Sequence, residues 1–157
     1  MIVCNTSPLI ALAILDKLQL LDALMGEWIV PAAAAREGTV DRKPFSERLA
    51  EALSGHVVGL NDGRVADALS LSLGRGEAEV LALAEERHCG GVLIDDRKGR
   101  RAARLRGLRV VGTVGLLLRA KRRGLVGEIR PLLDRLIEND IRISKDLFAK
   151  ALELAGE

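Results

Sequence analysis

The fold prediction for this chain depends most on the stretch Gly90-Gly-Val-Leu-Ile-Asp-Asp-Arg-Lys-Gly-Arg-Arg101. Its apolar residues at 91–94 predict a buried strand, and the two carboxylates of Asp95 and Asp96 follow directly, before a basic helix that begins at about Lys98. In open parallel sheets the functional site lies beyond the carboxyl ends of the strands, where loops and helix starts meet. The Asp pair therefore stands where such a site is expected.

Asp95 and Asp96 also fit an ordinary turn, because Asp is common in turns and caps helices. In that case the four basic residues that follow only neutralise two carboxylates on a solvated surface. Metal binding and helix capping both remain open at this point.

Apolar strands alternate with amphipathic helices along the whole chain, which predicts a parallel sheet between two helical layers. We predict one three-layer α/β/α domain over residues 1–157, with a sheet of about four to five strands. Its core spans about 1–125, and C-terminal helices at about 126–157 cover the sheet or contact a partner. The predicted strands are 2–4, 28–30, 56–60, 91–94 and 108–111, residues 39–46 form a polar loop, and helices occupy about 8–15, 18–25, 32–37, 49–53, 65–73, 77–87, 98–106, 113–123, 127–139 and 144–154.

The composition limits the classes of function. Only three residues are aromatic, Trp28, Phe45 and Phe148, so a base-stacking platform is not expected. The net charge of +2 is too small to indicate nucleic-acid binding by itself. The basic residues nevertheless cluster at 97–109 and 119–123, and we interpret the second cluster as a solvated helix face.

Cys4 and Cys89 stand alone, without the CxxC spacing of a zinc site, which is typical of a reducing compartment. Charged and polar residues interrupt the apolar segment 9–24, so we expect neither a membrane span nor a signal peptide. The expected location is the cytoplasm.

Four polar residues fall where this layout brings loops and helix starts together, and they are Asn5, Glu37, Glu77 and Asp96. Hard divalent cations prefer oxygen ligands, and Mg²⁺ takes one or two carboxylates directly. Each residue also has a plainer explanation: Asn5 as a cap, Glu37 as a surface residue, Glu77 as a partner of the helix dipole. Glu79 is two residues from Glu77, so at most one of the two points into such a pocket.

Four segments in this order resemble the PIN-domain proteins, most closely the branch found as toxins of prokaryotic toxin–antitoxin pairs. They are Val3-Cys-Asn-Thr-Ser-Pro-Leu-Ile10, the stretch from Val30-Pro31 to Glu37, Gly76-Glu-Ala-Glu-Val-Leu-Ala-Leu-Ala84 and Val92-Leu-Ile-Asp-Asp96. The match covers roughly residues 1–125, and the tail also resembles that branch.

The resemblance implies a Mg²⁺- or Mn²⁺-dependent ribonuclease, often a homodimer, that a small antitoxin protein holds inactive. Carried over by position, the acidic quartet falls on Asn5, Glu37, Glu77 and Asp96. Ser7 and Asp95 are the supporting neighbours, and the metal ligands are Glu37, Glu77, Asp95 and Asp96. Contacts to RNA phosphates fall to Arg97, Lys98, Arg100 and Arg101.

The chain departs from the family at Asn5, where the nucleases have Asp. An amide oxygen can still ligate a cation, but the loss of a negative charge weakens binding. One hypothesis is that Asp95 supplies the missing charge. The alternative function is a PIN-like scaffold of low or no activity that acts as a protein-binding module. A nucleotide-binding function is weaker, because Gly74-Arg75-Gly76 is neither GxGxxG nor a P-loop.

Overall fold

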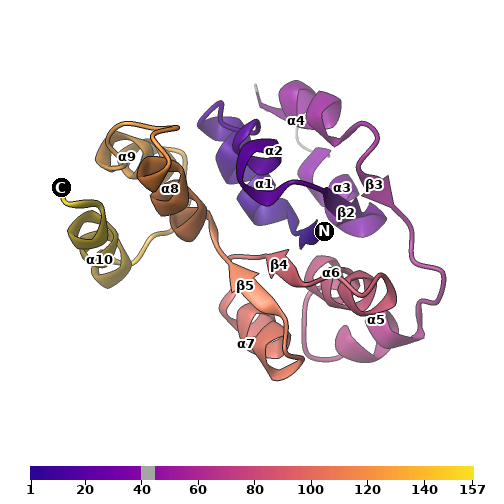
Figure 1. Ribbon diagram of the computed structural model, residues 1–157. Helices are drawn as coiled ribbons and strands as arrows, with labels where there is room; N and C mark the ends of the chain where they lie inside the picture. The colour runs from indigo at the N-terminus through magenta and orange to yellow at the C-terminus, as the bar shows by residue number, and fades with distance from the viewer. Residues whose placement is uncertain (40–44) are drawn as a thin grey trace.

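The computed structural model describes residues 1–39 and 45–157 and contains one sheet of five parallel strands (Figure 1). Their order across the sheet is β3-β2-β1-β4-β5. The chain therefore builds outward from β1 in one direction and then, with β4, in the other, so the strand order reverses between β1 and β4. The strands are β1 (Ile2–Cys4), β2 (Trp28–Pro31), β3 (Val57–Val58), β4 (Gly91–Leu93) and β5 (Arg109–Val111).

Helices cover both faces of this sheet, as predicted (Figure 1). α6 packs on β1, β2 and β4 and carries α5 and α7 beside it, whereas α1 contacts α8 and α9 in the other layer. α3 touches both α1 and α6. The helices are α1 (Thr6–Ile14), α2 (Leu20–Met25), α3 (Ala32–Thr39), α4 (Ser46–Leu53), α5 (Arg64–Leu69), α6 (Arg75–Glu86), α7 (Arg97–Leu105), α8 (Thr113–Arg122), α9 (Arg130–Glu138) and α10 (Lys145–Ala155).

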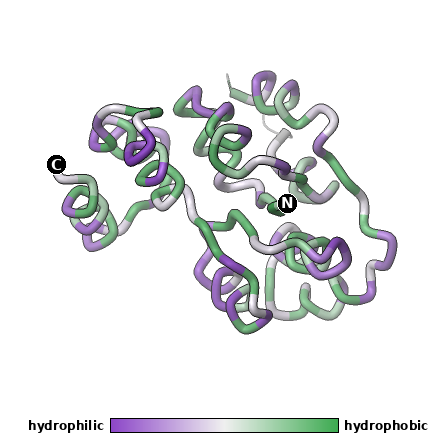
Figure 2. The backbone as a smooth tube through the Cα atoms, viewed as in Figure 1, coloured by the Kyte–Doolittle hydropathy of each residue, from purple (hydrophilic) through white to green (hydrophobic). Residues whose placement is uncertain are grey.

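Strand alternation divides the hydrophobic core into two clusters, one on each face of the sheet. Ile2 and Cys4 belong to the larger cluster, which α1, α2, α8 and α9 complete. Val3, between them, belongs to the smaller cluster under α6 and α7. Figure 2 shows the hydrophobic trace along the sheet and the hydrophilic residues concentrated on α7. The three-layer prediction is confirmed.

The C-terminal helices are joined to α8 by packing and by a carboxylate. Leu133 of α9 and Ala151 of α10 are buried in the larger cluster, and α10 packs on α8. Glu157 accepts hydrogen bonds from the backbone N–H groups of Ile129 (2.8 Å) and Arg130 (3.0 Å), and from Lys121 Nζ (2.8 Å). Glu157 therefore connects the end of the chain to the start of α9 and to α8.

Several boundaries differ from the prediction. α1 begins at Thr6 and not at about Pro8, and β3 is limited to Val57–Val58 within the predicted 56–60. α6 begins at Arg75 and not at 77, because Gly74, whose backbone is extended, is its N-cap residue. Gly76 therefore lies in the first turn of the helix. Of the predicted loop 39–46, residues 40–44 lie outside the described residues.

Within the described part of the chain, no helix has both the length and the apolar character that crossing a membrane requires.

The bonds to Glu157 make a pH-dependent contribution to stability. Desolvation raises the pKa of Glu157, but hydrogen bonds from Lys121, Ile129 and Arg130 outweigh it and lower the pKa to about 2, from 4.5. A carboxyl group whose pKa is lower in the folded than in the unfolded protein stabilises the fold at pH values above its unfolded pKa. For Glu157 this contribution is lost as the pH falls from about 4.5 to about 2.

We therefore expect Glu157→Gln to lower the unfolding midpoint at pH 7, and the difference from the unmodified protein to shrink as the pH approaches 2.5. Urea unfolding of both proteins at several pH values between 7 and 2.5 measures this difference in midpoint. Glu153→Gln is the matched control, because Glu153 lies on α10, four residues before Glu157, and its side chain pairs with the exposed Lys150. A difference that stays constant with pH would contradict the assigned bonds.

Candidate functional site

Asn5 lies at the point where the strand order reverses, directly after β1. Its backbone N–H donates to the carbonyl oxygen of Leu93 at 2.9 Å, which holds it against the end of β4. The side chain is 1% exposed and does not cap α1, although Asn5 occupies the N-cap position. Nδ2 donates instead to Glu77 Oε1 at 3.1 Å. Capping, one of the two sequence interpretations of Asn5, is thus excluded.

The other polar atom of the Asn5 side chain, its amide oxygen, has no hydrogen-bond partner among the described residues. Oδ1 is buried and accepts no hydrogen bond from the described residues. Leaving a buried acceptor unpaired costs about 1–3 kcal/mol, so such atoms commonly mark a place where a ligand completes the bonding.

Glu37 of α3 approaches the same place, at the first turn of α6. A Cβ on Gly76 would lie 2.8 Å from Glu37 Oε2 and 3.3 Å from Asn5 Oδ1. Any larger residue at 76 would therefore push these two oxygens apart. Asn5, Glu37 and Glu77 are brought together around Gly76, although they are far apart in the sequence.

The charges in this group repel one another. Desolvation and then the negative charge of Glu77 raise the pKa of Glu37, while a hydrogen bond from the Gly76 N–H lowers it, and the charge of Glu79 adds to the rise. Oxygen atoms crowded in this way favour a cation between them.

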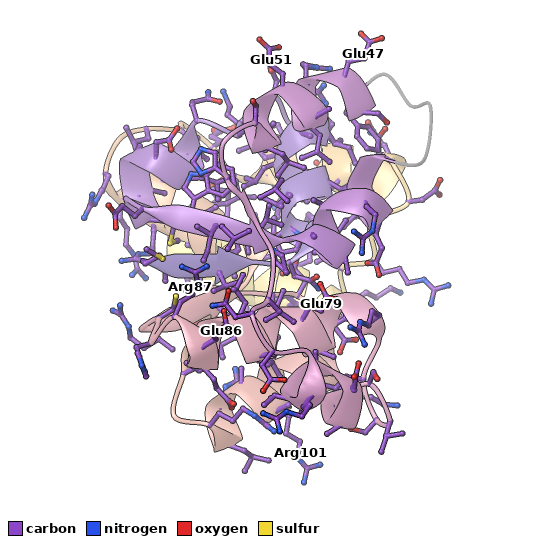
Figure 3. All side chains as sticks on the ribbon, turned by 90° about the vertical axis from the view of Figure 1, so that its right-hand side faces the viewer. Glu47, Glu51, Glu79, Glu86, Arg87 and Arg101 are labelled. Atoms are coloured by element: carbon purple, nitrogen blue, oxygen red, sulfur yellow. The ribbon has the colours of Figure 1, made fainter. Side chains whose placement is uncertain are left out.

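Glu79 has a structural role. Its side chain is buried, at 8% exposure, and accepts from the Ala33 N–H (3.1 Å) and from Arg75 Nε (3.0 Å). It therefore satisfies a free N–H at the start of α3. Figure 3 shows Glu79 inside the fold, unlike Glu47 and Glu51, which extend into solvent from α4. Of the two glutamates weighed in the sequence, Glu77 is the one that reaches Asn5.

Asp96 caps α7, since its Oδ2 accepts from the Gly99 N–H at 2.8 Å. Gly99 also adjoins Glu77, because a Cβ at 99 would lie 3.2 Å from Glu77 Cγ. Asp96 is thus the cap of α7, the glycine that it bonds adjoins Glu77, and the bond uses only one oxygen of Asp96.

Asp95 is directed toward α8. Its Oδ1 accepts from the Thr113 N–H at 2.8 Å and its Oδ2 from Thr113 Oγ1 at 2.5 Å. Gly112 occupies the N-cap position of α8, and Asp95, two residues after β4, supplies the capping oxygen from outside the helix. No contact described in the structure joins Asp95 to Asn5. The hypothesis that Asp95 replaces the charge missing at Asn5 stays a prediction.

A cleft of about 1090 Å³ lies beside this group and continues past β5 to the segment between α9 and α10, although Asn5 and Glu37 themselves do not line it. Ser7, Glu77, Asp95 and Asp96 line one end of it. The basic residues along its walls are Arg97, Arg100, Arg104, Arg119 and Arg142.

The arginines of α7 repeat at spacings of three and four, so Arg97, Arg100 and Arg104 share one face of that helix. Lys98 and Arg101, which the sequence grouped with them, do not line the cleft. The helical spacing was the signal that identifies Arg104. Arg119 was interpreted as part of a solvated face but lines the cleft, and nothing in the local sequence pointed to Arg142.

The acidic residues form a looser set than a ready metal site. Within residues 1–39 and 45–157, no three Asp, Glu, His or Cys side chains gather as a metal-binding group. The set brought together around Gly76 contains two carboxylates, of Glu37 and Glu77, and the amide of Asn5.

A family model described as DUF3368, PIN domain, matches residues 1–157. No curated protein and no solved structure matches the chain. The family match therefore includes α9 and α10 together with the sheet.

Proposed function

The chain belongs to the PIN-domain family, which has a nuclease-type fold, and from this premise we propose that it is an endoribonuclease dependent on Mg²⁺ or Mn²⁺. The observation that supports the proposal most is the buried, unpartnered Oδ1 of Asn5 beside the carboxylate of Glu37. Both are oxygen donors of the kind that hard divalent cations bind.

The residues present fit such a cation. Asn5 Oδ1, Glu37 and Glu77 would hold it, and Asp96 would hold its water, because the cap bond to Gly99 leaves Oδ1 of Asp96 free for another partner. A bound Mg²⁺ or Mn²⁺ supplies the charge that activates water and stabilises a phosphodiester transition state.

The other roles belong to the chain itself. The Asn5 Nδ2–H fixes the carboxylate of Glu77 in one orientation, and Gly76 keeps space open between Glu37 and Asn5. Ser7 lines the same end of the cleft, where its hydroxyl would orient the substrate. Arg97 and Arg100 would bind RNA phosphates, since their side chains line the cleft beside Asp96.

We further propose that the protein is the toxin of a cytoplasmic toxin–antitoxin pair, a homodimer inhibited by a small antitoxin protein. The similarity of the segments around Asn5, Glu37, Glu77 and Asp96 to the toxin branch supports this. A short open reading frame that overlaps the start of the gene would strengthen it.

The alternative, a PIN scaffold that binds proteins and cleaves little RNA, is favoured by one observation. Asn5 donates a hydrogen bond to Glu77, whereas an Asp at position 5 would add a third carboxylate. Measurement of RNA cleavage separates the two functions.

We expect the purified protein to cleave mixed cellular RNA in Mn²⁺ or Mg²⁺ but not in chelator. Glu77→Gln should lower the rate by about 100-fold, because it removes a charge that holds the cation. Glu85→Gln, on the exposed side of the same helix, where Glu85 pairs with Arg106, is the matched control and should cleave normally. Equal cleavage by Glu77→Gln would indicate a contaminating nuclease, and no cleavage by folded protein would favour the scaffold.

Asn5→Asp should have opposite effects with and without the cation. In chelator the buried extra charge beside Glu77 should destabilise the protein by about 1–3 kcal/mol. In Mn²⁺ the third carboxylate should tighten binding about tenfold. Thermal unfolding and calorimetric titration with Mn²⁺ measure both effects, and an unchanged Mn²⁺ affinity would show that position 5 does not contact the ion.

A further inference from the structure

The stretch Gly74-Arg75-Gly76 at the start of α6 contains a glycine to which the proposed function gives no role. Gly76 keeps space open between Glu37 and Asn5, but Gly74 lies outside that contact. Gly74 is the N-cap residue of α6, with φ −61° and ψ 156°. Any L-residue adopts this extended conformation, so the backbone does not require a glycine here.

Helix capping does not explain Gly74 either. Ser, Thr, Asp and Asn are the usual N-cap residues, because their side chains accept a hydrogen bond from a free N–H in the first turn. α6 begins without such a side-chain bond. Gly74 is also exposed, so a side chain at this position would not enter the core. The chain therefore lacks a stabilising cap at a position where the backbone permits one.

The side chain of Glu77 accounts for the glycine. A Cβ on Gly74 would overlap with Glu77 Oε2 and would lie 3.5 Å from Glu77 Cδ. The two residues are three positions apart, so they are neighbours on the surface of the helix. The Glu77 carboxylate therefore occupies the space that a Cβ at position 74 would need.

A second glycine, Gly99 of α7, borders the aliphatic part of the same side chain. A Cβ on Gly99 would lie 3.2 Å from Glu77 Cγ and 2.5 Å from Cδ1 of the buried Ile94. Glu77 thus has Gly99 beside its Cγ, Gly74 beside one carboxylate oxygen, and Asn5 Nδ2 bonded to the other oxygen. These three contacts define one orientation of the carboxylate.

Orientation matters for a glutamate that holds a cation. A long, flexible side chain loses rotamer entropy when it is fixed, and this loss weakens binding if it occurs only when the ligand arrives. A carboxylate that the protein has already oriented avoids that loss on binding. Residues that orient a metal ligand commonly change metal affinity by about 10- to 100-fold.

We propose that Gly74 is a positioning residue for Glu77. Because Gly74 has no Cβ, the Glu77 carboxylate lies where it meets Asn5, and a larger residue at 74 turns that carboxylate away. Gly99 acts similarly on the Glu77 Cγ, but a larger residue there also meets Ile94, so position 74 is the one to test. That Glu77 holds a cation rests on the proposed function, whereas the orientation of its carboxylate does not.

The first test is calorimetric titration with Mn²⁺. Gly74→Ala and Gly74→Ser should each weaken binding about tenfold, since both add the Cβ that displaces the carboxylate. In chelator, both variants should keep a thermal unfolding midpoint within about 3 °C of the unmodified protein, because position 74 is exposed. If Gly74 served only the fold, the midpoint would fall and the Mn²⁺ affinity would stay unchanged, which would contradict the proposal.

Two controls separate this effect from helix capping. Gly63 is the N-cap residue of α5, and a Cβ on it would approach Asp67 Oδ2 no closer than 4.0 Å. Gly63→Ser should therefore change Mn²⁺ affinity less than about twofold. In a Glu77→Ala background, Gly74→Ser should also change it less than about twofold, because no carboxylate remains to be displaced. An equal loss in Gly63→Ser, or a tenfold loss that persists without Glu77, would overturn the proposal.

The second test needs neither cation nor RNA. In chelator, the NMR resonances of the Asn5 side-chain amide report its hydrogen bond to Glu77, and Glu77→Ala gives their positions without that bond. Gly74→Ala and Gly74→Ser should move these resonances toward the Glu77→Ala positions. Unchanged resonances would overturn the proposal. An unmodified protein that binds no Mn²⁺ would contradict the proposed nuclease function, and the Asn5 resonances alone would then decide the role of Gly74.

Discussion

The reversal of strand order between β1 and β4 determines where everything else in this molecule lies. β1 and β4 run parallel and end side by side, and Cys4 of β1 pairs with Leu93 of β4, 89 positions further along the chain. Asn5 and the Asp pair therefore leave the sheet at adjacent points. α6 crosses the same place, because it packs on β1, β2 and β4, and it brings Glu77 to Asn5.

Local stability and the site compete for the same polar groups. Asp95, Asp96 and Glu79 each satisfy free N–H groups at helix starts, which stabilises α8, α7 and α3. Asn5 behaves differently, since it gives up its capping bond and leaves one oxygen buried without a partner. A protein retains such an atom at a cost of about 1–3 kcal/mol. A ligand bound to the oxygen would offset this free-energy cost. The unpartnered oxygen distinguishes Asn5 from the three capping carboxylates.

The sequence predicted the layers, the parallel sheet and the convergence of Asn5, Glu37 and Glu77, because alternating strands and helices leave few topologies and strand ends are visible in the pattern. Helical spacing alone did not decide between Glu77 and Glu79, although the family resemblance assigned Glu77, and the sequence left metal binding and helix capping open for Asp95 and Asp96. Those outcomes depend on contacts with Ala33, Gly99 and Thr113, and only Gly99 is close by in sequence. The set of basic residues predicted to contact RNA phosphates was also incomplete. Arg142 reaches the cleft through the packing of α9 and α10, and no local periodicity in the sequence indicates that packing.

The central claim is that Asn5 Oδ1 is a cation ligand. Crystals grown in chelator and then soaked in Mn²⁺ would test it by the anomalous difference map, which locates manganese without reference to activity. The account predicts a peak in contact with Asn5 Oδ1 and bounded by Glu37 and Glu77. A well-ordered crystal with no peak there, or with manganese held only by Asp95 and Asp96, would contradict it.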